Sequence, residues 1–244
     1  MKTAILSDIH ANFHALSAVI EDIKKQGCEK ILCLGDLAMA GPEPEKVIDF
    51  VRKQNNWEII QGNTDKMIGD FDPQFVEVMR PKFPVMANAL LDDISILNDE
   101  HKNYLKNLPA QKELEIEGVK ILMVHGSPRR NNEDILPDMP LNEVEEMIAG
   151  VDADIIFCGH THVPCGYQTS NRKTVVNVGS VGRPMTKNPE ACYVVADFKN
   201  GEISVEHRFV DYDREGASKI MLSRGFEGAE KLAEMILHPT ERHA

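Results

Sequence analysis

Five short polar clusters in this chain each follow an apolar run. They are Asp8-Ile9-His10, Gly35-Asp36, Gly62-Asn63, His125-Gly126 and Gly159-His160-Thr161-His162. An isolated Asp-x-His often arises by chance and is usually a turn or a surface pair. An ordered set of carboxylate, amide and imidazole groups, each closing a predicted strand, indicates instead a pair of divalent cations that share one carboxylate and one activated water.

The spacing inside two of these clusters suits metal ligation. Side chains two residues apart on an extended segment point the same way, so Asp8 and His10 can reach one ion together. By the same geometry, His160 and His162 can share an ion or divide between two. All four side chains are therefore predicted ligands.

Three further ligands, Asp36, Asn63 and His125, are predicted where other strands end. The Asp36 carboxylate has two oxygens and can bridge both ions, while the Asn63 amide oxygen adds a neutral hard ligand. The glycines before Asp36, Asn63 and His160 are expected to adopt backbone angles that turn these side chains toward a common point. Oxygen and nitrogen ligation without thiolate favours two transition-metal ions (Mn, Fe, Ni or Zn) over Ca²⁺.

Such a metal pair indicates hydrolysis of P–O bonds. Two cations about 3.5–4 Å apart would activate a bridging hydroxide, orient it for in-line attack on phosphorus and take up charge on the non-bridging oxygens. No protein nucleophile would be needed, and the sequence has no Gly-x-Ser-x-Gly arrangement. The side chains predicted to carry catalysis are Asp36, Asn63 and His125.

The elements that must position these groups alternate in the first third of the chain. Apolar runs at 2–7, 30–34 and 57–60 are predicted strands. An apolar stripe from Leu16 to Ile23 predicts a helix that ends at Gly27, and a second helix includes residues 47–51. Alternation of this kind predicts parallel strands whose carboxyl ends gather the active groups along one edge.

The remainder of the chain is predicted to complete a single domain, residues 1–244. Residues 71–109 are expected to form a helical insertion, with a helix start near Asn98, and it stays open whether they act as a lid. The later runs predict an antiparallel second half. The predicted elements are a hairpin of 114–117 and 120–124, a helix at 141–149, strands at 154–157, 166–169, 174–178, 192–197 and 203–209, and C-terminal helices at 212–222 and 227–237.

Composition limits the partners. The 244 residues carry a formal net charge of −12 and contain no basic stripe, which argues against a groove for polymeric nucleic acid. A small phosphorylated substrate is easier to reconcile with this charge. No segment has the length of a signal-peptide core or a membrane span, so we expect no membrane association and a cytoplasmic protein. A homo-oligomer stays open, because periodicity does not separate core from interface.

The cysteines, and the histidines outside the polar clusters, are less informative about function. Five cysteines without a Cys-x-x-Cys pair fit reduced, mostly buried thiols. A solvent-facing helix position is the favoured interpretation for His14. The histidines expected to be structural or exposed are His101, His207, His238 and His243.

The polar clusters, taken together with their flanking residues, resemble the calcineurin-like metallophosphoesterases, particularly their small bacterial and archaeal phosphodiesterase branch. The resemblance spans about residues 1–210 and implies an α/β fold (α+β by some schemes), a four-layer αββα sandwich with two mixed central sheets. The matching segments are Ser7 to Asn12, Gly35-Asp36 with Gly41-Pro42, Gly62 to Asp65, His125 to Pro128, Gly159 to His162 and Asn177 to Gly182.

The resemblance also implies how the predicted ligands are divided between the two metals. One metal would be held by Asp8, His10, Asp36 and His162, and the other by Asp36, Asn63, His125 and His160, with Asp36 shared. Many relatives have histidine directly after the Gly-Asn pair, where it is thought to protonate the leaving oxygen, but this chain has Thr64. A threonine hydroxyl is a poor acid near neutrality, so activated phosphodiesters and anhydrides are expected to be favoured over simple alkyl esters.

Candidate substrate contacts lie close to the clusters. Asn12, Asn63, Arg129 and Arg183 are predicted to contact the phosphate, the arginines through bidentate hydrogen bonds. For Asn12, capping of the next helix is the stronger alternative. Arg130 is a further candidate for phosphate binding. For each of the three arginines, a surface position without a functional role is equally expected. The glycine turn 179–182 is a weak candidate for a phosphate cradle. Asp65 is a candidate for orienting a ligand, and starting the following helix explains it nearly as well.

The sequence therefore predicts a binuclear metal-dependent phosphoesterase, in the first place a phosphodiesterase. A diadenosine-polyphosphate hydrolase or a phosphoprotein phosphatase with the same site are the enzymatic alternatives. A metal-bound scaffold protein is the non-enzymatic alternative, and the complete set of predicted ligands argues against it.

Overall fold

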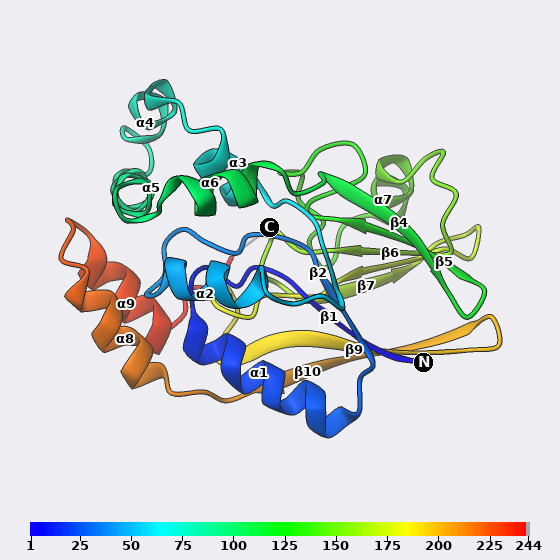
Figure 1. Ribbon diagram of the computed structural model, residues 1–244. Coiled ribbons are helices and arrows are strands. Elements are labelled where there is room, and N and C mark those ends of the chain that lie inside the picture. The colour runs from blue at the N-terminus through cyan, green and yellow to red at the C-terminus, as the bar shows by residue number, and fades with distance from the viewer. Residues whose placement is uncertain (243–244) are drawn as a thin grey trace.

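The computed structural model describes residues 1–242 and contains two five-stranded sheets with helices on their outer faces (Figure 1). His243 lies outside the described residues. The first sheet has the order β10 (Glu202–Val210), β9 (Ala191–Lys199), β1 (Lys2–Leu6), β2 (Lys30–Cys33) and β3 (Trp57–Ile59). The second has the order β4 (Gln111–Ile116), β5 (Val119–Val124), β6 (Ile155–Cys158), β8 (Thr174–Asn177) and β7 (Cys165–Gln168).

Alternating side chains of the buried strands fill two different cores. In β1, Ala4 and Leu6 pack toward the helices, whereas Ile5 joins the core between the two sheets. Phe157 of β6 enters the same inter-sheet core, while its neighbour Ile156 packs toward α7 (Leu141–Met147). Strands buried on both faces therefore hold the layers together, and the predicted four-layer αββα sandwich is confirmed.

The first third of the chain folds as the sequence predicts. β1, β2 and β3 are parallel, and helices α1 (Phe13–Gln26) and α2 (Pro44–Val51) connect them. The Asn12 side chain caps α1 by accepting a hydrogen bond from the Ala15 N–H, and Gly27 ends the helix in the left-handed conformation, with φ 70°. These parallel strands all point their carboxyl ends at one edge of the sheet.

The predicted insertion at 71–109 is helical. It contains α4 (Pro73–Met79), α5 (Pro84–Ile96) and α6 (Asp99–Lys106), and it follows α3 (Asn63–Gly69). Asn98 caps α6 through its side chain, as predicted. In Figure 1, α4 lies at the top of the molecule, and α5 lies below it and above α8 and α9.

The prediction of an antiparallel second half is wrong for β8. The pairs β7–β8 and β9–β10 are antiparallel, but β8 pairs in parallel with β6. The reason is that β7 takes the sheet edge, so the following strand returns to the vacant position beside β6. The connection from β8 to β9 then crosses from one sheet to the other, which a tight turn between them would not allow.

The chain ends in two helices, α8 (Arg214–Ser223) and α9 (Ala229–Leu237), which begin slightly later than predicted. Met221 and Leu232 of this pair join the core that covers the first sheet. All five cysteines are free. Within residues 1–242, no helix has both the length and the apolar character needed to cross a membrane.

Candidate metal centre

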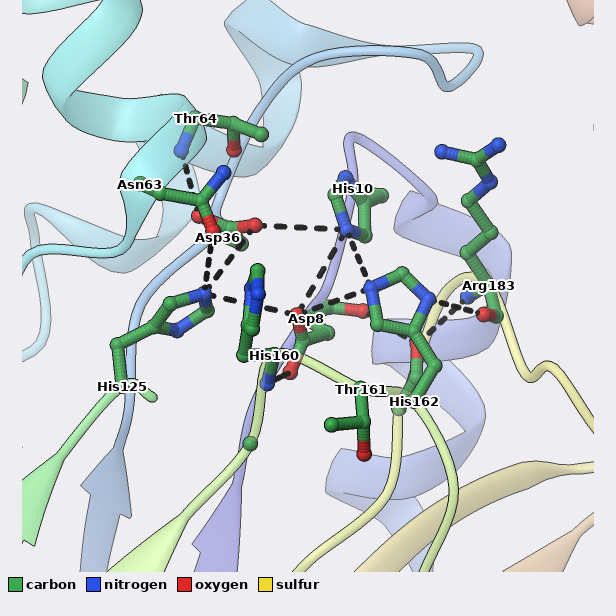
Figure 2. A network of polar contacts seen from close by, with 12 residues as sticks. Asp8, His10, Asp36, Asn63, Thr64, His125, His160, Thr161, His162 and Arg183 are labelled. Carbon is green, nitrogen blue, oxygen red and sulfur yellow. Dashed lines mark hydrogen bonds and ion pairs between the residues drawn. The ribbon is translucent and has the colours of Figure 1, made fainter. Parts of the chain in front are cut away.

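The structure brings the seven predicted metal ligands together where the two sheets meet (Figure 2). Each side chain follows the carboxyl end of a strand. They are Asp8 and His10 after β1, Asp36 after β2, Asn63 after β3, His125 after β5, and His160 and His162 after β6. Five segments that follow strands, the first and last about 150 residues apart in the sequence, thus converge as the strand-end argument predicts.

The imidazole nitrogens of three histidines face the carboxylates of Asp8 and Asp36. His162 Nε2 lies 3.1 Å from Asp8 Oδ1, and His10 Nε2 lies 3.6 Å from Asp36 Oδ2. His125 Nε2 lies 3.4 Å from Asp36 Oδ2. Two sets of donor atoms, each within 4.8 Å of one another, are compact enough for an ion, namely Asp8–His10–His162 and Asp8–Asp36–His125. Asp8 belongs to both sets, whereas the sequence argument gave the shared role to Asp36 alone.

Backbone carbonyls orient these three imidazoles. The Nδ1 atoms of His10, His125 and His162 pair with the carbonyl oxygens of Met39, Leu34 and Arg183 at 2.9, 2.8 and 2.6 Å. With Nδ1 donating to a carbonyl, Nε2 is the nitrogen left to bind a metal. None of these carbonyl partners can be identified from the sequence.

The contacts that hold His160 differ from those of the other three imidazoles. Its backbone N–H donates to Asp8 Oδ2 at 3.0 Å, and its Nε2 lies 3.3 Å from Asp134 Oδ1. Arg242 holds the same Asp134 carboxylate through Nη2, at 2.7 and 2.6 Å, and its Nη1 donates to the His160 carbonyl. The Asp134–Arg242 pair therefore fixes His160 from a loop and from the C-terminal segment, and no sequence pattern pointed to either residue.

The free oxygens of the two aspartates fit a cation. Asp8 Oδ1 is buried and has no hydrogen-bond partner among residues 1–242, although Oδ2 accepts the His160 N–H. Asp36 Oδ1 accepts the Thr64 N–H at 2.8 Å, while Oδ2 faces His10 and His125. A buried, unpartnered carboxylate oxygen is costly unless something positive occupies the site. The donor set therefore suits divalent metal ions.

The ionisation of Asp8, Asp36 and His125 is consistent with a site for divalent cations. Burial alone would raise the pKa values of Asp8 and Asp36, but the surrounding imidazoles outweigh it. The result is a pKa well below the usual range for Asp8 and about 2 for Asp36. Burial opposes the charged form of His125, yet Asp36 and Asp8 raise its pKa to about 10. Without metal, a proton on His125 thus balances part of the negative charge that a cation would neutralise.

Five of the seven predicted ligands adopt the left-handed backbone conformation. The residues are Asp8, His10, Asp36, His160 and His162, with φ of 55°, 44°, 53°, 68° and 61°. This conformation costs non-glycine residues on the order of 1 kcal/mol or more, and such strain clusters at functional sites. Of the glycines predicted to adopt unusual backbone angles, Gly35 does so, with φ 94°. Gly62 and Gly159 have no positive φ, so the predicted role is wrong for these two.

Gly62 and Gly159 are needed for space instead. Gly62 has φ −84°, and a Cβ there would lie 2.0 Å from Asp36 Oδ1. A Cβ at Gly159 would lie 2.2 Å from Ser7 Oγ and 2.5 Å from Asp8 Oδ2. The backbone at both positions approaches a ligand carboxylate too closely for any side chain.

Asp65 anchors the loop that carries Asp36. Its carboxylate accepts the N–H groups of Asp36, Leu37 and Gly62 at 2.8, 2.8 and 2.9 Å, and it is fully buried. It therefore both begins α3 and orients a predicted ligand, so the two roles considered for it from the sequence coincide.

We expect Asp65→Ala to lower the free energy of unfolding by about 3 kcal/mol or more, because three buried N–H donors lose their acceptor. Urea unfolding of the metal-free protein measures the effect. Asp70→Ala, which removes an exposed ion pair with Lys106 at the end of α3, is the control and should change stability by less than about 1 kcal/mol. Equal effects of the two substitutions would contradict the anchoring role.

A cavity of about 220 Å³, here called the site pocket, opens beside the predicted ligands. Asp8 and His125 are buried and do not line it. The polar part of its lining consists of His10, Asp36, Asn63, Thr64, His160, His162, Arg183 and Arg242. The predicted substrate contacts Asn63 and Arg183 therefore reach this pocket.

Two other predicted substrate contacts, Asn12 and Arg129, do not reach the site pocket. Asn12 is fully buried, and after capping α1 it donates through Nδ2 to the Gly182 carbonyl and the Tyr212 hydroxyl. Arg129 pairs with Glu133 at 3.0 and 2.7 Å and lines a separate hollow. Asn12 is therefore a cap, as its alternative interpretation held, and Arg129 is held at the surface by a carboxylate four residues away.

The other weaker candidates also have structural roles. Arg130 pairs with the same Glu133. In the glycine turn 179–182, the N–H groups of Val181 and Gly182 donate to the carbonyls of Ser7 and Asp8, so they brace the loop after β1 and are not free to cradle phosphate.

Arg183 is the one predicted arginine whose guanidinium reaches the site pocket without a carboxylate partner among the described residues. Its Nε is buried without a hydrogen-bond partner, and Nη1 contacts Met86 Sδ at 3.5 Å. Burial lowers the pKa of Arg183 to about 10, which still leaves it charged at neutral pH. A charged donor held in this way suits a phosphate oxygen.

Thr64 lines the site pocket, but its hydroxyl is already engaged. Oγ1 donates to the Ala38 carbonyl at 3.0 Å, and the backbone N–H donates to Asp36 Oδ1. Thr64 thus positions Asp36 and offers no free proton at this position.

The comparisons with known proteins agree with the fold. A family model described as the calcineurin-like phosphoesterase superfamily domain matches residues 1–201. An uncharacterized protein of Methanocaldococcus jannaschii is 29% identical over 238 residues, which cover 91% of this chain and 92% of that protein.

Two crystal structures extend the likeness over nearly the whole chain. A hypothetical protein from Pyrococcus horikoshii has a TM-score of 0.86 at 25% identity, and 99% of each chain is covered. A metallophosphoesterase from Sphaerobacter thermophilus has a TM-score of 0.74 at 26% identity, with 98% of each chain covered. The resemblance drawn from the motifs is confirmed, and this chain belongs to the calcineurin-like phosphoesterase superfamily.

Proposed function

We propose that this protein is a binuclear metal-dependent phosphodiesterase that acts on small phosphorylated substrates. The observation that carries the proposal is the orientation of three imidazole Nε2 atoms, fixed by backbone carbonyls, toward the free oxygens of two buried, ionised carboxylates. Family membership supports the reaction class. The number and identity of the metals and the diester specificity belong to the proposal.

The residues of the chain would hold the two cations as follows. His10 and His162 lie on one side, His125 and Asn63 on the other, and the carboxylates of Asp8 and Asp36 lie between them. Two divalent transition-metal ions would supply Lewis acidity and an activated water. Asp134 and Arg242 fix the orientation of His160 at this centre.

The substrate would be held and oriented by the pocket side chains. The Arg183 guanidinium reaches the pocket and forms no salt bridge with any carboxylate of residues 1–242, so it can bind a phosphate oxygen. The Asn63 amide lines the same pocket, with Oδ1 3.1 Å from His125 Nε2. Because the Thr64 hydroxyl is bonded to Ala38, the chain supplies no proton there to a leaving alkoxide.

The test loads metal-free protein separately with Mn²⁺, Fe²⁺, Ni²⁺ and Zn²⁺ and screens phosphomonoesters, phosphodiesters and nucleotide anhydrides. General acid catalysis contributes about 10²–10⁴-fold, so without it aryl diesters should be cleaved faster than alkyl monoesters by a factor in that range. Faster hydrolysis of alkyl phosphomonoesters would overturn the proposal. The same panel detects a diadenosine-polyphosphate hydrolase, and phosphopeptides added to it detect a phosphoprotein phosphatase.

A scaffold role makes a different prediction. Metal-loaded protein would then bind a partner but turn over no activated diester with any of the four ions. The complete and oriented ligand set argues against it, because a scaffold has no need of unpartnered carboxylate oxygens. We also propose a cytoplasmic location, which the five free cysteines support, since disulfides are rare in reducing compartments.

A further inference from the structure

The apolar part of the lining of the site pocket is rich in sulfur. Five of the chain's 11 methionines line the pocket together with one phenylalanine. We call this surface the methionine wall, and its residues are Met39, Met67, Met79, Phe83, Met86 and Met185. They come from the loop after β2, from α3, α4 and α5, and from the loop after β8. The helical insertion thus supplies half of the wall.

Packing in the hydrophobic core explains the position of only some residues of the methionine wall. Met67, Met79 and Met86 pack against the main core on one side but remain half-buried, with their other side at the pocket. Phe83 belongs to no core cluster and is 61% exposed. A phenylalanine exposed at the rim of a pocket costs the free protein favourable burial, which a ligand lying against it would restore.

Arg183 joins the wall to the metal centre. Its guanidinium contacts Met86 Sδ on one side, and its carbonyl orients His162 on the other. A phosphoryl group gripped by Arg183 would therefore lie at the border between the polar ligands and the methionine wall. A substituent of that phosphoryl group would have the wall within reach.

We propose that the methionine wall binds an aromatic ring carried by the phosphorylated substrate. This inference rests on the proposed phosphodiesterase function and names its substrate class. Flexible thioethers make favourable sulfur–aromatic contacts and adapt to a flat ring. At about 220 Å³ the pocket is smaller than the roughly 300–1,000 Å³ typical of larger ligands, which suits one ring system. The wall itself has no charged side chain that would favour a polar substituent.

The test measures binding and needs no turnover. Methylphosphonate, cyclohexylphosphonate and phenylphosphonate share a non-hydrolysable phosphonate and differ in the substituent. Their dissociation constants for the full-length, Mn²⁺-loaded protein are measured by calorimetry at one pH. Partial burial of a ring predicts that phenylphosphonate binds about tenfold or more tightly than methylphosphonate, and also more tightly than cyclohexylphosphonate.

Substitutions in the methionine wall test whether it causes the preference for phenylphosphonate over methylphosphonate. Phe83→Ser and Met79→Ser should each reduce the phenyl-to-methyl ratio several-fold and leave methylphosphonate binding unchanged. Phe75→Ser is the matched control, because Phe75 lies on α4, is 50% exposed and does not line the site pocket. It should retain the ratio of the wild-type protein.

The outcomes separate this inference from the proposed function. If methylphosphonate binds but phenylphosphonate binds no better, or if cyclohexylphosphonate binds as well as phenylphosphonate, the aromatic site is refuted while the metal centre stands. If Phe75→Ser reduces the ratio as much as Phe83→Ser, the wall is not the binding surface. If the protein binds no phosphonate when loaded with any of Mn²⁺, Fe²⁺, Ni²⁺ or Zn²⁺, the proposed function fails as well.

Discussion

Asp36→Asn is expected to lower kcat/KM on an aryl phosphodiester by on the order of 10³-fold or more with every metal tested. The substitution keeps the side-chain shape, and the amide oxygen can still accept the Thr64 N–H that bonds Oδ1 in the native protein. What it removes is the negative charge between His10 and His125. Loss of that charge disturbs both metal positions, so metal content should fall together with activity.

Steady-state kinetics and metal analysis on the same sample provide the measurement. Asp70→Asn is the matched control, because Asp70 ends α3 with an exposed carboxylate bound to Lys106 and lies outside the site pocket. It should retain the activity and the metal content of the native protein. An Asp36→Asn protein that hydrolyses the diester within tenfold of the native rate would remove Asp36 from the proposed centre.

Arg183→Met should lower kcat/KM about 100-fold while leaving the free energy of unfolding unchanged or slightly higher. A charged hydrogen bond to phosphate contributes about 1.5–3 kcal/mol, and one such bond at the upper end of this range accounts for an effect of this order. In the free protein, however, the guanidinium is buried with Nε unpartnered, so its removal relieves a desolvation cost. Methionine also fits the thioether surface around it.

The two readouts distinguish a substrate contact from a structural cation. Activity on the aryl diester and urea unfolding are measured on both proteins, with Arg129→Met as the control. Arg129 pairs with Glu133 outside the site pocket, so its loss should leave activity intact. If Arg183→Met unfolds far more readily than the native protein and keeps its activity, Arg183 has a structural role only.

The sequence identified the candidate metal ligands because each of them follows an apolar run. Strands of period two, with helix-length connections, predict parallel strands, and parallel strands bring their carboxyl ends to one edge. Asp8, Asp36 and His125 follow from that argument without any knowledge of tertiary contacts. The αββα layering followed from the resemblance of the motifs, and the structure confirms it.

The predictions that failed depend on which partner lies next to a residue. Arg129 and Arg183 both follow glycine-containing clusters, yet only Arg183 reaches the site pocket, because Glu133 holds Arg129 at the surface. Asn12 follows the first motif, but its amide is used by Gly182 and Tyr212, which lie 170 and 200 residues away. The pairing of β8 with β6 likewise depended on β7 taking the sheet edge.

The chain by itself thus determined where strands and helices form and which side chains end the strands, since periodicity and capping act over a few neighbouring residues. Only the packed structure decided which groups orient the ligands and what surrounds them. The carbonyls behind the imidazoles, the Asp134–Arg242 pair beside His160 and the methionine wall all join segments far apart along the chain. Their contacts exist only once the two sheets and the helical insertion have packed, so no local pattern can encode them.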